Sequence, residues 1–92
     1  MSTFPKLSSE AVMETCSILN ILSPKSSPRI IEGNEARKAF QNYRFENIES
    51  HLSFISKRGA IKISQTNNYL PLKLSAIEDI KVNHKNLGNL ME

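Results

Sequence analysis

Apolar residues recur at helical spacing between residues 9 and 22, and this pattern predicts an amphipathic helix near the start of the chain. Val12, Cys16 and Leu19 follow one another at positions i, i+4 and i+7, which places them on one face of a helix. Ser8 stands directly before this pattern, where a serine hydroxyl caps the free N–H groups of a first turn. The sequence therefore predicts a helix from Ser9 to about Leu22, with Cys16 as a buried structural thiol.

A second helix is predicted after a loop at residues 23–28, where two prolines and three serines disfavour regular structure. Residues 29–32 fit a short extended segment. Asn34 is a suitable cap for the helix that follows. This helix would bury apolar residues spaced i, i+3, i+4 and i+7, namely Ala36, Ala39, Phe40 and Tyr43.

The segment between residues 45 and 57 fits two patterns. As a helix it would end at Gly59 and bury one apolar stripe, formed by Phe45, Ile48, Leu52 and Ile55. As a strand, residues 50–56 would pair with the next segment through a three-residue loop in which Gly59 takes the left-handed position. The strand is favoured because it would complete a three-stranded meander, and a lone two-stranded hairpin is only marginally stable.

Two alternating segments predict an antiparallel hairpin in the second half of the chain. Residues 60–65 alternate isoleucine with polar side chains, and residues 69–74 alternate leucine with other residues. A turn at Thr66–Asn68 would join them. Pro71 would confine the second strand to an edge of the sheet, because proline has no N–H for the ladder.

The last part of the chain leaves its structure open. Residues 77–82 fit either a short helix capped by Ser75 or a fourth strand, and the polar tail beyond His84 is expected to fray. Together the elements predict a single α+β domain over residues 1–92, in which two N-terminal helices pack on a small antiparallel β-meander. A helix in the middle segment would instead give three helices followed by a hairpin, the order of a winged helix-turn-helix.

Few residues are suited to catalysis or metal binding. The single cysteine excludes an internal disulfide and a cysteine-based metal cluster, and three scattered glycines form no phosphate-binding loop. His51 and His84 lack a recognised metal-ligand spacing, although such a pair could serve a small ribonuclease or toxin as acid and base. That is the lesser alternative, and we expect a protein with no enzyme activity, cofactor or metal.

The apolar runs are too short for a signal peptide or a membrane span. The longest run, Ile18–Leu22, is interrupted by Asn20. A lone cysteine is also common in reducing compartments, where disulfides rarely form. The expectation is a soluble cytoplasmic protein.

Positive charge is concentrated in two parts of the chain and predicts an anionic partner. The net charge is +3. Residues 23–45 and 57–92 each carry an excess of cations, whereas residues 46–56 carry two acids and neither lysine nor arginine. A fold that joins the two cationic parts would present a basic face to phosphate-rich partners such as RNA. The predicted partner-binding residues are cations that bind phosphate or carboxylate and a tyrosine that stacks on bases: Arg29, Arg37, Lys38, Tyr43, Arg44, Lys57, Arg58, Lys62 and Lys73.

Mutation of these cations is expected to separate binding from stability. Replacement of Arg37 or Arg58 by Glu should weaken binding of the partner and leave the thermal midpoint nearly unchanged, because exposed charges contribute little to folding.

The chain resembles phage-encoded anti-CRISPR proteins directed at type I-F surveillance complexes. The resemblance extends over the full length and is carried by the opening segment Met1–Glu10 and by the segment Phe45–Phe54. It implies a non-enzymatic inhibitor that acts in the bacterial host cytoplasm in viral counter-defence. Such an inhibitor binds the protein subunits and guide RNA of the ribonucleoprotein and blocks target DNA hybridisation, without a membrane or small-molecule substrate. Several acidic members of this group mimic DNA, and this basic chain departs from that pattern.

A small winged-helix DNA-binding regulator is the alternative function. Residues 51–61 would then run from a recognition helix into the wing of the hairpin. Glu46 and Glu49 argue against this alternative, because they bring negative charge to the same helix. A regulator of this kind would bind free duplex DNA with an affinity that falls steeply with salt.

Overall fold

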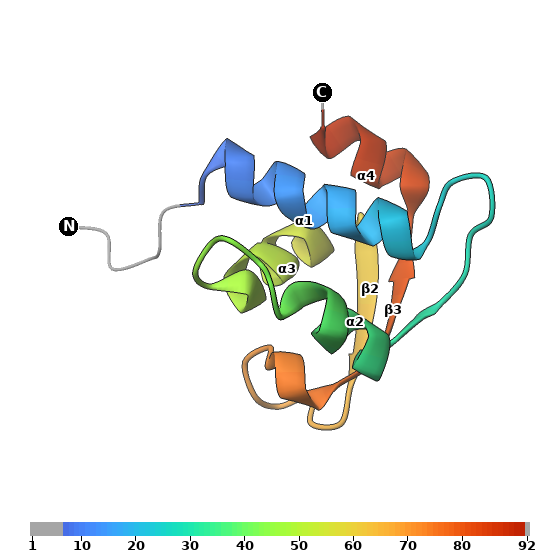
Figure 1. Cartoon of the computed structure of the whole chain (residues 1–92). Helices are drawn as coiled ribbons and strands as arrows, with labels where there is room; N and C mark the ends of the chain where they lie inside the picture. The colour runs from blue at the N-terminus through green and yellow to red at the C-terminus, as the bar shows by residue number, and fades with distance from the viewer. Residues whose placement is uncertain (1–6, 92) are drawn as a thin grey trace.

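The computed structural model describes residues 7–91 and has the predicted α+β class (Figure 1). Within these residues the chain forms four α-helices, one 3-10 turn and a three-stranded antiparallel sheet. In chain order the elements are α1 (Ser9–Leu22), β1 (Ile31–Glu32), α2 (Gly33–Phe40), α3 (Ile48–Lys57), β2 (Ile61–Gln65), η1 (Leu74–Ala76), β3 (Ile77–Val82) and α4 (His84–Leu90).

The first helix has the predicted limits. The side chain of Ser8 accepts a hydrogen bond from the N–H of Ala11 at 3.1 Å, which caps the first turn as expected. At the other end the N–H of Ser23 donates to the carbonyl of Leu19 at 2.9 Å. Cys16 is fully buried, and burial raises the pKa of its thiol. The prediction of a buried cysteine is therefore confirmed.

The middle segment is helix α3, so the favoured prediction of a strand at residues 50–56 is wrong. Leu52 and Ile55 are both fully buried. Two residues three positions apart lie on opposite faces of a strand but on the same face of a helix, so only the helix buries both against α1. Gly59 ends this segment with a φ of 77°, the left-handed conformation that both alternatives required of it.

The hairpin pairs β2 with a different partner from the predicted one. Residues 69–74 form no strand, and β3 takes their place beside β2, with Ile61 opposite Val82 and Ile63 opposite Ile80. Ile77, Ile80 and Val82 are buried, whereas the leucines of residues 69–74 are only partly buried or exposed and Pro71 lacks a ladder donor. Greater burial therefore favours the strand alternative for residues 77–82.

The sheet is completed by an early and very short strand. β1 pairs antiparallel with β3, with Ile31 opposite Ile80, so the strand order is β1-β3-β2. The predicted extended segment at residues 29–32 thus reaches the sheet in its last two residues. Its neighbour in sequence, α2, packs against the start of β3.

The polar tail forms helix α4, so the prediction that it frays is wrong. The side chain of Asn83 caps the helix by accepting from the N–H of Asn86 at 3.2 Å, and Leu87 is buried. Asn86 also donates from Nδ2 to the carbonyl of Gly59 at 3.0 Å. The asparagine cap therefore orders the first turn of α4, and the buried Leu87 and the Asn86–Gly59 hydrogen bond hold this polar segment against the domain.

The core lies between the helices and the sheet; in the view of Figure 1, α1 and α2 cross in front of β2, and α3 lies to the left of the strands. Leu19 from α1, Leu52 and Ile55 from α3, and Ile31 and Ile80 from the sheet are fully buried. Each such side chain contributes about 2 kcal/mol relative to an exposed position. No helix within residues 7–91 has the length and hydrophobicity that crossing a bilayer requires.

Candidate functional site

A groove of about 550 Å³ lies between α3 and the loop that joins β2 to β3, residues 66–76. We call it the α3 groove. Its walls come from the segment before α1, from one face of α3 and from the β2–β3 loop. The lining residues are Leu7, Glu49, Ser50, Ser53, Phe54, Lys57, Pro71, Leu72 and Lys73.

Helix α3 has one face toward the core and one toward this groove. Its buried residues are His51, Leu52 and Ile55. Ser50, Ser53 and Lys57 follow at i, i+3 and i+7 on the other side, where they line the groove. The helix therefore presents two hydroxyl groups and one ammonium group in a single row.

Glu49 connects α3 to the β2–β3 loop. Its carboxylate accepts a hydrogen bond from the backbone N–H of Leu74 at 2.7 Å. Leu72 and Leu74 pack against the core beneath the loop. Because a charge-assisted hydrogen bond is stronger than a neutral one, Glu49 is a fixed anchor for the loop. Its negative charge is thus already compensated in part by a backbone donor.

Lys57 and Lys73 line the α3 groove from opposite walls. They are two of the nine predicted partner-binding residues, and they come from α3 and from the β2–β3 loop. Lys57 also lies in the last turn of α3, where a cation interacts favourably with the helix dipole. The fold therefore brings together two cations that are 16 positions apart in the sequence.

Arg37 forms hydrogen bonds with the backbone at the start of β3. Its Nη1 donates to the carbonyls of Leu74 at 3.2 Å and Ile77 at 2.9 Å, and its Nη2 donates to Oδ1 of Asn34 at 2.6 Å. Three donors of the guanidinium are thus used within the domain. The expectation that Arg37→Glu leaves stability unchanged is therefore replaced: loss of these hydrogen bonds should destabilise the domain.

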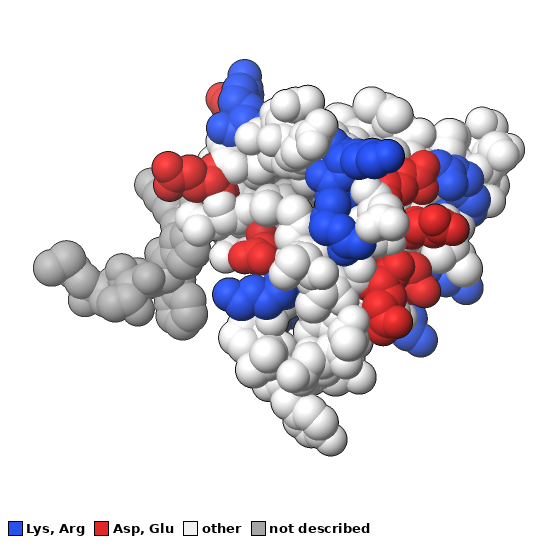
Figure 2. Space-filling model, turned by 60° about the horizontal axis from the view of Figure 1, so that its bottom comes forward, with Lys and Arg blue, Asp and Glu red and all other residues white. Residues whose placement is uncertain are grey.

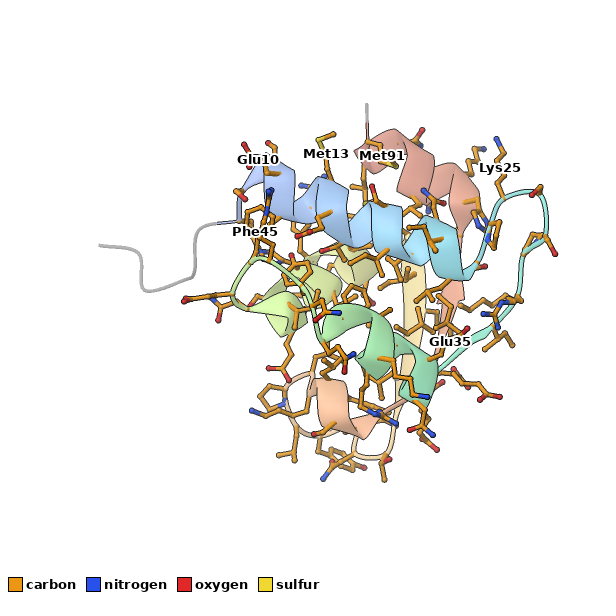
Figure 3. All side chains as sticks on the ribbon, viewed as in Figure 1. Glu10, Met13, Lys25, Glu35, Phe45 and Met91 are labelled. Atoms are coloured by element: carbon orange, nitrogen blue, oxygen red, sulfur yellow. The ribbon has the colours of Figure 1, made fainter. Side chains whose placement is uncertain are left out.

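The other predicted arginines also contact groups within the domain. Arg29 pairs with Glu35, and its hydrogen bond lowers the pKa of that carboxyl. Arg44 lies 4.7 Å above the ring of Phe45 and 3.7 Å from Glu10, at the amino-terminal end of α1 (Figure 3). Arg58 covers the ring of Phe54 at 5.0 Å. These stacked arginines still expose charge, whereas Arg29 is balanced by its acidic partner.

Tyr43 belongs to a polar network beneath α3. Its hydroxyl lies 3.0 Å from Oγ1 of Thr15 and 2.6 Å from Nδ1 of His51, and it donates to the carbonyl of Ala11 at 3.2 Å. The ring is half-buried, and burial is the main cause that raises the pKa of Tyr43. The network joins α1 to α3, so Tyr43 positions the helix and has little surface left for stacking on a base.

Neither histidine lines the α3 groove. His51 is 4% exposed and forms a hydrogen bond with the hydroxyl of Tyr43, while Nε2 of His84 forms a hydrogen bond with the carbonyl of Ser23. Both rings thus have contacts with other groups of the domain, and the ribonuclease alternative gains no support from these contacts.

Stability is expected to fall in mild acid because of His51. Burial lowers the pKa of this imidazole, since charging it inside the domain loses solvation. In the unfolded chain the ring binds a proton near pH 6.5, about the model-peptide value. The contribution of the neutral His51 to the free energy of unfolding is therefore fully present above that pH, and it is lost as the pH falls toward the lower folded pKa. Urea unfolding between about pH 7 and 5 should show the decrease.

Two substitutions assign this pH dependence. His51→Gln should flatten the decrease over the same range, and His84→Gln should retain it. An equal slope for wild type and His51→Gln would assign the dependence to other groups.

The remaining predicted residues, Lys38 and Lys62, are exposed. Lys62 lies directly opposite Lys81 in the sheet, not beside Lys73, because β2 pairs with β3. Basic and acidic side chains alternate over much of the face seen in Figure 2. That face is mixed in charge and is not a continuous basic surface, and the α3 groove is the candidate site that two of the predicted cations share.

Sequence reasoning missed three polar residues of the site, namely Glu49, Ser50 and Ser53. The helical interpretation of residues 45–57 would have found them, since positions 50, 53 and 57 lie opposite the apolar stripe. The part played by the β2–β3 loop could not be found in this way, because it depends on which strands pair.

No protein-family model, curated protein or solved structure shows a significant match to the chain. The resemblance to anti-CRISPR inhibitors therefore stays a prediction. Residues 1–6 of its opening segment lie outside the described residues, and its second segment, Phe45–Phe54, contributes Glu49, Ser50, Ser53 and Phe54 to the α3 groove.

Proposed function

We propose that the chain is a winged helix-turn-helix protein that binds double-stranded DNA with α3 in the major groove. The observation that carries this proposal is the element order: helix, strand, two helices and a hairpin, with the last strand between the other two. Winged helix-turn-helix proteins have this arrangement, in which the helix before the hairpin is the recognition helix. In this chain α3 has that position, and the β2–β3 loop is the wing.

The row of α3 side chains in the groove, with Ser50 and Ser53 half-buried and Lys57 exposed, is suited to base edges. A major groove about 12 Å wide admits a helix of about 10–12 Å diameter with its side chains. Serine hydroxyls donate to or accept from either kind of base edge, and a lysine at the helix end donates to the O6 and N7 acceptors of guanine. Ser50, Ser53 and Lys57 would meet base edges in this order along the groove.

The charges of the groove support a moderate affinity with a weaker dependence on salt than the steep one expected of a winged-helix regulator from the sequence. Lys57 and Lys73 stand on its two walls, and the one acid in the lining, Glu49, already accepts a hydrogen bond from the loop. Lys73 would contact a phosphate, and the charge of Lys57 would lie among the base edges of the same groove, so the two cations together would release about two counterions. This predicts a slope of about −2 for the logarithm of affinity against the logarithm of salt concentration. This is a weak dependence beside that of strongly basic regulators.

Charge reversal in the groove is expected to weaken duplex binding. Lys57→Glu and Lys73→Glu should each lower the affinity about tenfold or more, because each replaces a cation that the DNA attracts by a carboxylate that the DNA repels. Fluorescence anisotropy with a labelled mixed-sequence duplex at low salt measures the change. Lys25→Glu is the matched control: it alters the net charge equally, but Lys25 lies in the loop after α1 and does not line the α3 groove (Figure 3).

Two results would overturn the proposal. Wild-type protein that fails to bind duplex DNA even at low salt has no such function. An affinity for Lys25→Glu as low as that for Lys57→Glu would mean that net charge alone, without the groove, attracts the DNA.

Inhibition of a type I-F surveillance complex stays a separate prediction. It requires contact with protein subunits and guide RNA, and it does not require affinity for free duplex DNA. A target-binding assay with the assembled complex tests it directly. Unchanged capture of target DNA in the presence of excess protein would contradict it.

A further inference from the structure

The tip of the β2–β3 loop exposes two adjacent large apolar side chains. Tyr69 is 98% exposed and Leu70 is 55% exposed. Single apolar residues on a surface need no explanation, but an aromatic ring that makes almost no contact with its own domain does little for folding. Both residues project from the loop that forms one wall of the α3 groove. Their position points to a contact outside the chain.

Hydrogen bonds from one side chain connect distant parts of the loop. The side chain of Gln65 donates to the carbonyls of Asn67 at 3.0 Å and Leu70 at 3.4 Å, and it accepts from the N–H of Lys73 at 3.4 Å. Gln65 therefore joins both arms of the loop.

A second set of contacts orders the tip and the base. The N–H of Tyr69 donates to Oδ1 of Asn67 at 3.0 Å, and the N–H of Thr66 donates to the carbonyl of Ala76 at 3.0 Å. Glu49 anchors the loop to α3 near its end. A loop ordered before binding loses less entropy when it meets a partner.

The chemistry of the tip suits a nucleic acid. Residues 66–76 contain one cation, Lys73, and no acid. Asn67 and Asn68 precede the tyrosine, and amide side chains meet both donors and acceptors of the minor groove. The combination of a neutral to positive loop, amides and an apolar tip therefore favours DNA over a basic or purely apolar partner.

We propose that Tyr69, supported by Leu70, is a wedge that enters the minor groove and unstacks one base step while α3 lies in the major groove. This inference rests on the proposed function. Apolar side chains inserted between base pairs kink the duplex, and the unstacking energy is smallest at flexible or mismatched steps. The chain therefore prefers duplexes that contain such a step.

The test compares two duplexes of equal length, one fully paired and one with a central mismatch next to 2-aminopurine. Wild-type protein should bind the mismatched duplex at least about fivefold more tightly and increase the 2-aminopurine fluorescence, which reports unstacking. Tyr69→Ala should lose the fluorescence increase and the preference, and its affinity should fall about 5- to 150-fold, as for loss of one base–aromatic stack.

Two further variants make the result specific. Tyr69→Phe should keep the preference, because the ring and not the hydroxyl unstacks the bases. Ile21→Ala should also keep it; Ile21 is 75% exposed on α1, so this variant removes a comparable exposed apolar side chain outside the loop.

Each contrary outcome has one meaning. If Tyr69→Ala retains the preference for the mismatched duplex and the fluorescence increase, the wedge is overturned and the proposed DNA binding stays intact. The same holds if wild type binds both duplexes equally and causes no change in fluorescence. Failure of wild type to bind either duplex would overturn both proposals.

Discussion

Gly33→Ala is expected to destabilise the domain by about 3 kcal/mol or more, the upper part of the range for overpacked positions. A Cβ at this position would overlap the backbone carbonyl oxygen of Ile77 and would lie 3.0 Å from Nη1 of Arg37. The oxygen belongs to the first residue of β3, which is held in the sheet and cannot move as a flexible side chain would. Small domains have a total stability of about 5–10 kcal/mol, so the loss would be a large fraction.

Denaturant unfolding measures this change, with Gly88→Ala as the matched control. A Cβ at Gly88 meets no atom within 4 Å, and the residue lies inside α4. Because alanine is the better helix former, this variant should gain about 0.5–1 kcal/mol. Equal stability of Gly33→Ala and wild type would mean that α2 does not approach the start of β3 as closely as described.

Arg37→Glu is expected to lower the free energy of unfolding by about 3 kcal/mol, the second large effect. Hydrogen bonds from charged donors contribute about 1.5–3 kcal/mol each, and the new carboxylate would also face two carbonyl oxygens. The oxygens are those of Leu74 and Ile77, which Arg37 now binds. Because Leu74 is also the residue that Glu49 anchors, loss of Arg37 should loosen the β2–β3 loop as well. Thermal and urea unfolding measure the stability.

The neighbouring cation provides the control. Lys38→Glu makes the same change of charge on the same helix at an exposed position. Its free energy of unfolding should stay within about 0.5 kcal/mol of the wild-type value. If Arg37→Glu unfolds like wild type and loses only partner binding, then Arg37 is a binding residue, as the charge pattern of the sequence predicted, and its contacts with β3 contribute little.

The candidate site could be predicted from the sequence only in part. Lys57 and Lys73 were expected to bind a partner from their charge, and both line the α3 groove. Arg37 and Tyr43 were expected for the same reasons of side-chain type, yet their polar atoms bind carbonyls and side chains of this domain. Residue type shows which interactions a side chain favours, but the partner that satisfies them is set by the chain segments packed nearby.

The middle of the chain shows the same limit for secondary structure. The stripe of Ile48, Leu52 and Ile55 was visible as a helical alternative, but the strand was favoured in order to complete a meander with residues 69–74. β3 supplies the missing strand from further along the chain, so no strand was needed at residues 50–56. A choice that depends on a distant pairing partner cannot be made from the local pattern.

By itself the sequence determined the features that depend on neighbouring residues: the limits of α1 with its serine cap, the buried Cys16, the left-handed Gly59 and the alternation of β2. These depend on spacing, capping and backbone preference over a few positions. The tertiary structure alone decided the partner of β2, the structural use of Arg37 and Glu49, and the groove between α3 and the β2–β3 loop. The residues paired between β2 and β3 are 12 to 21 positions apart, and the contacts of Glu49 with Leu74 and of Arg37 with Ile77 join residues 25 and 40 positions apart. The free energy of these contacts arises only when burial of the core brings the segments together.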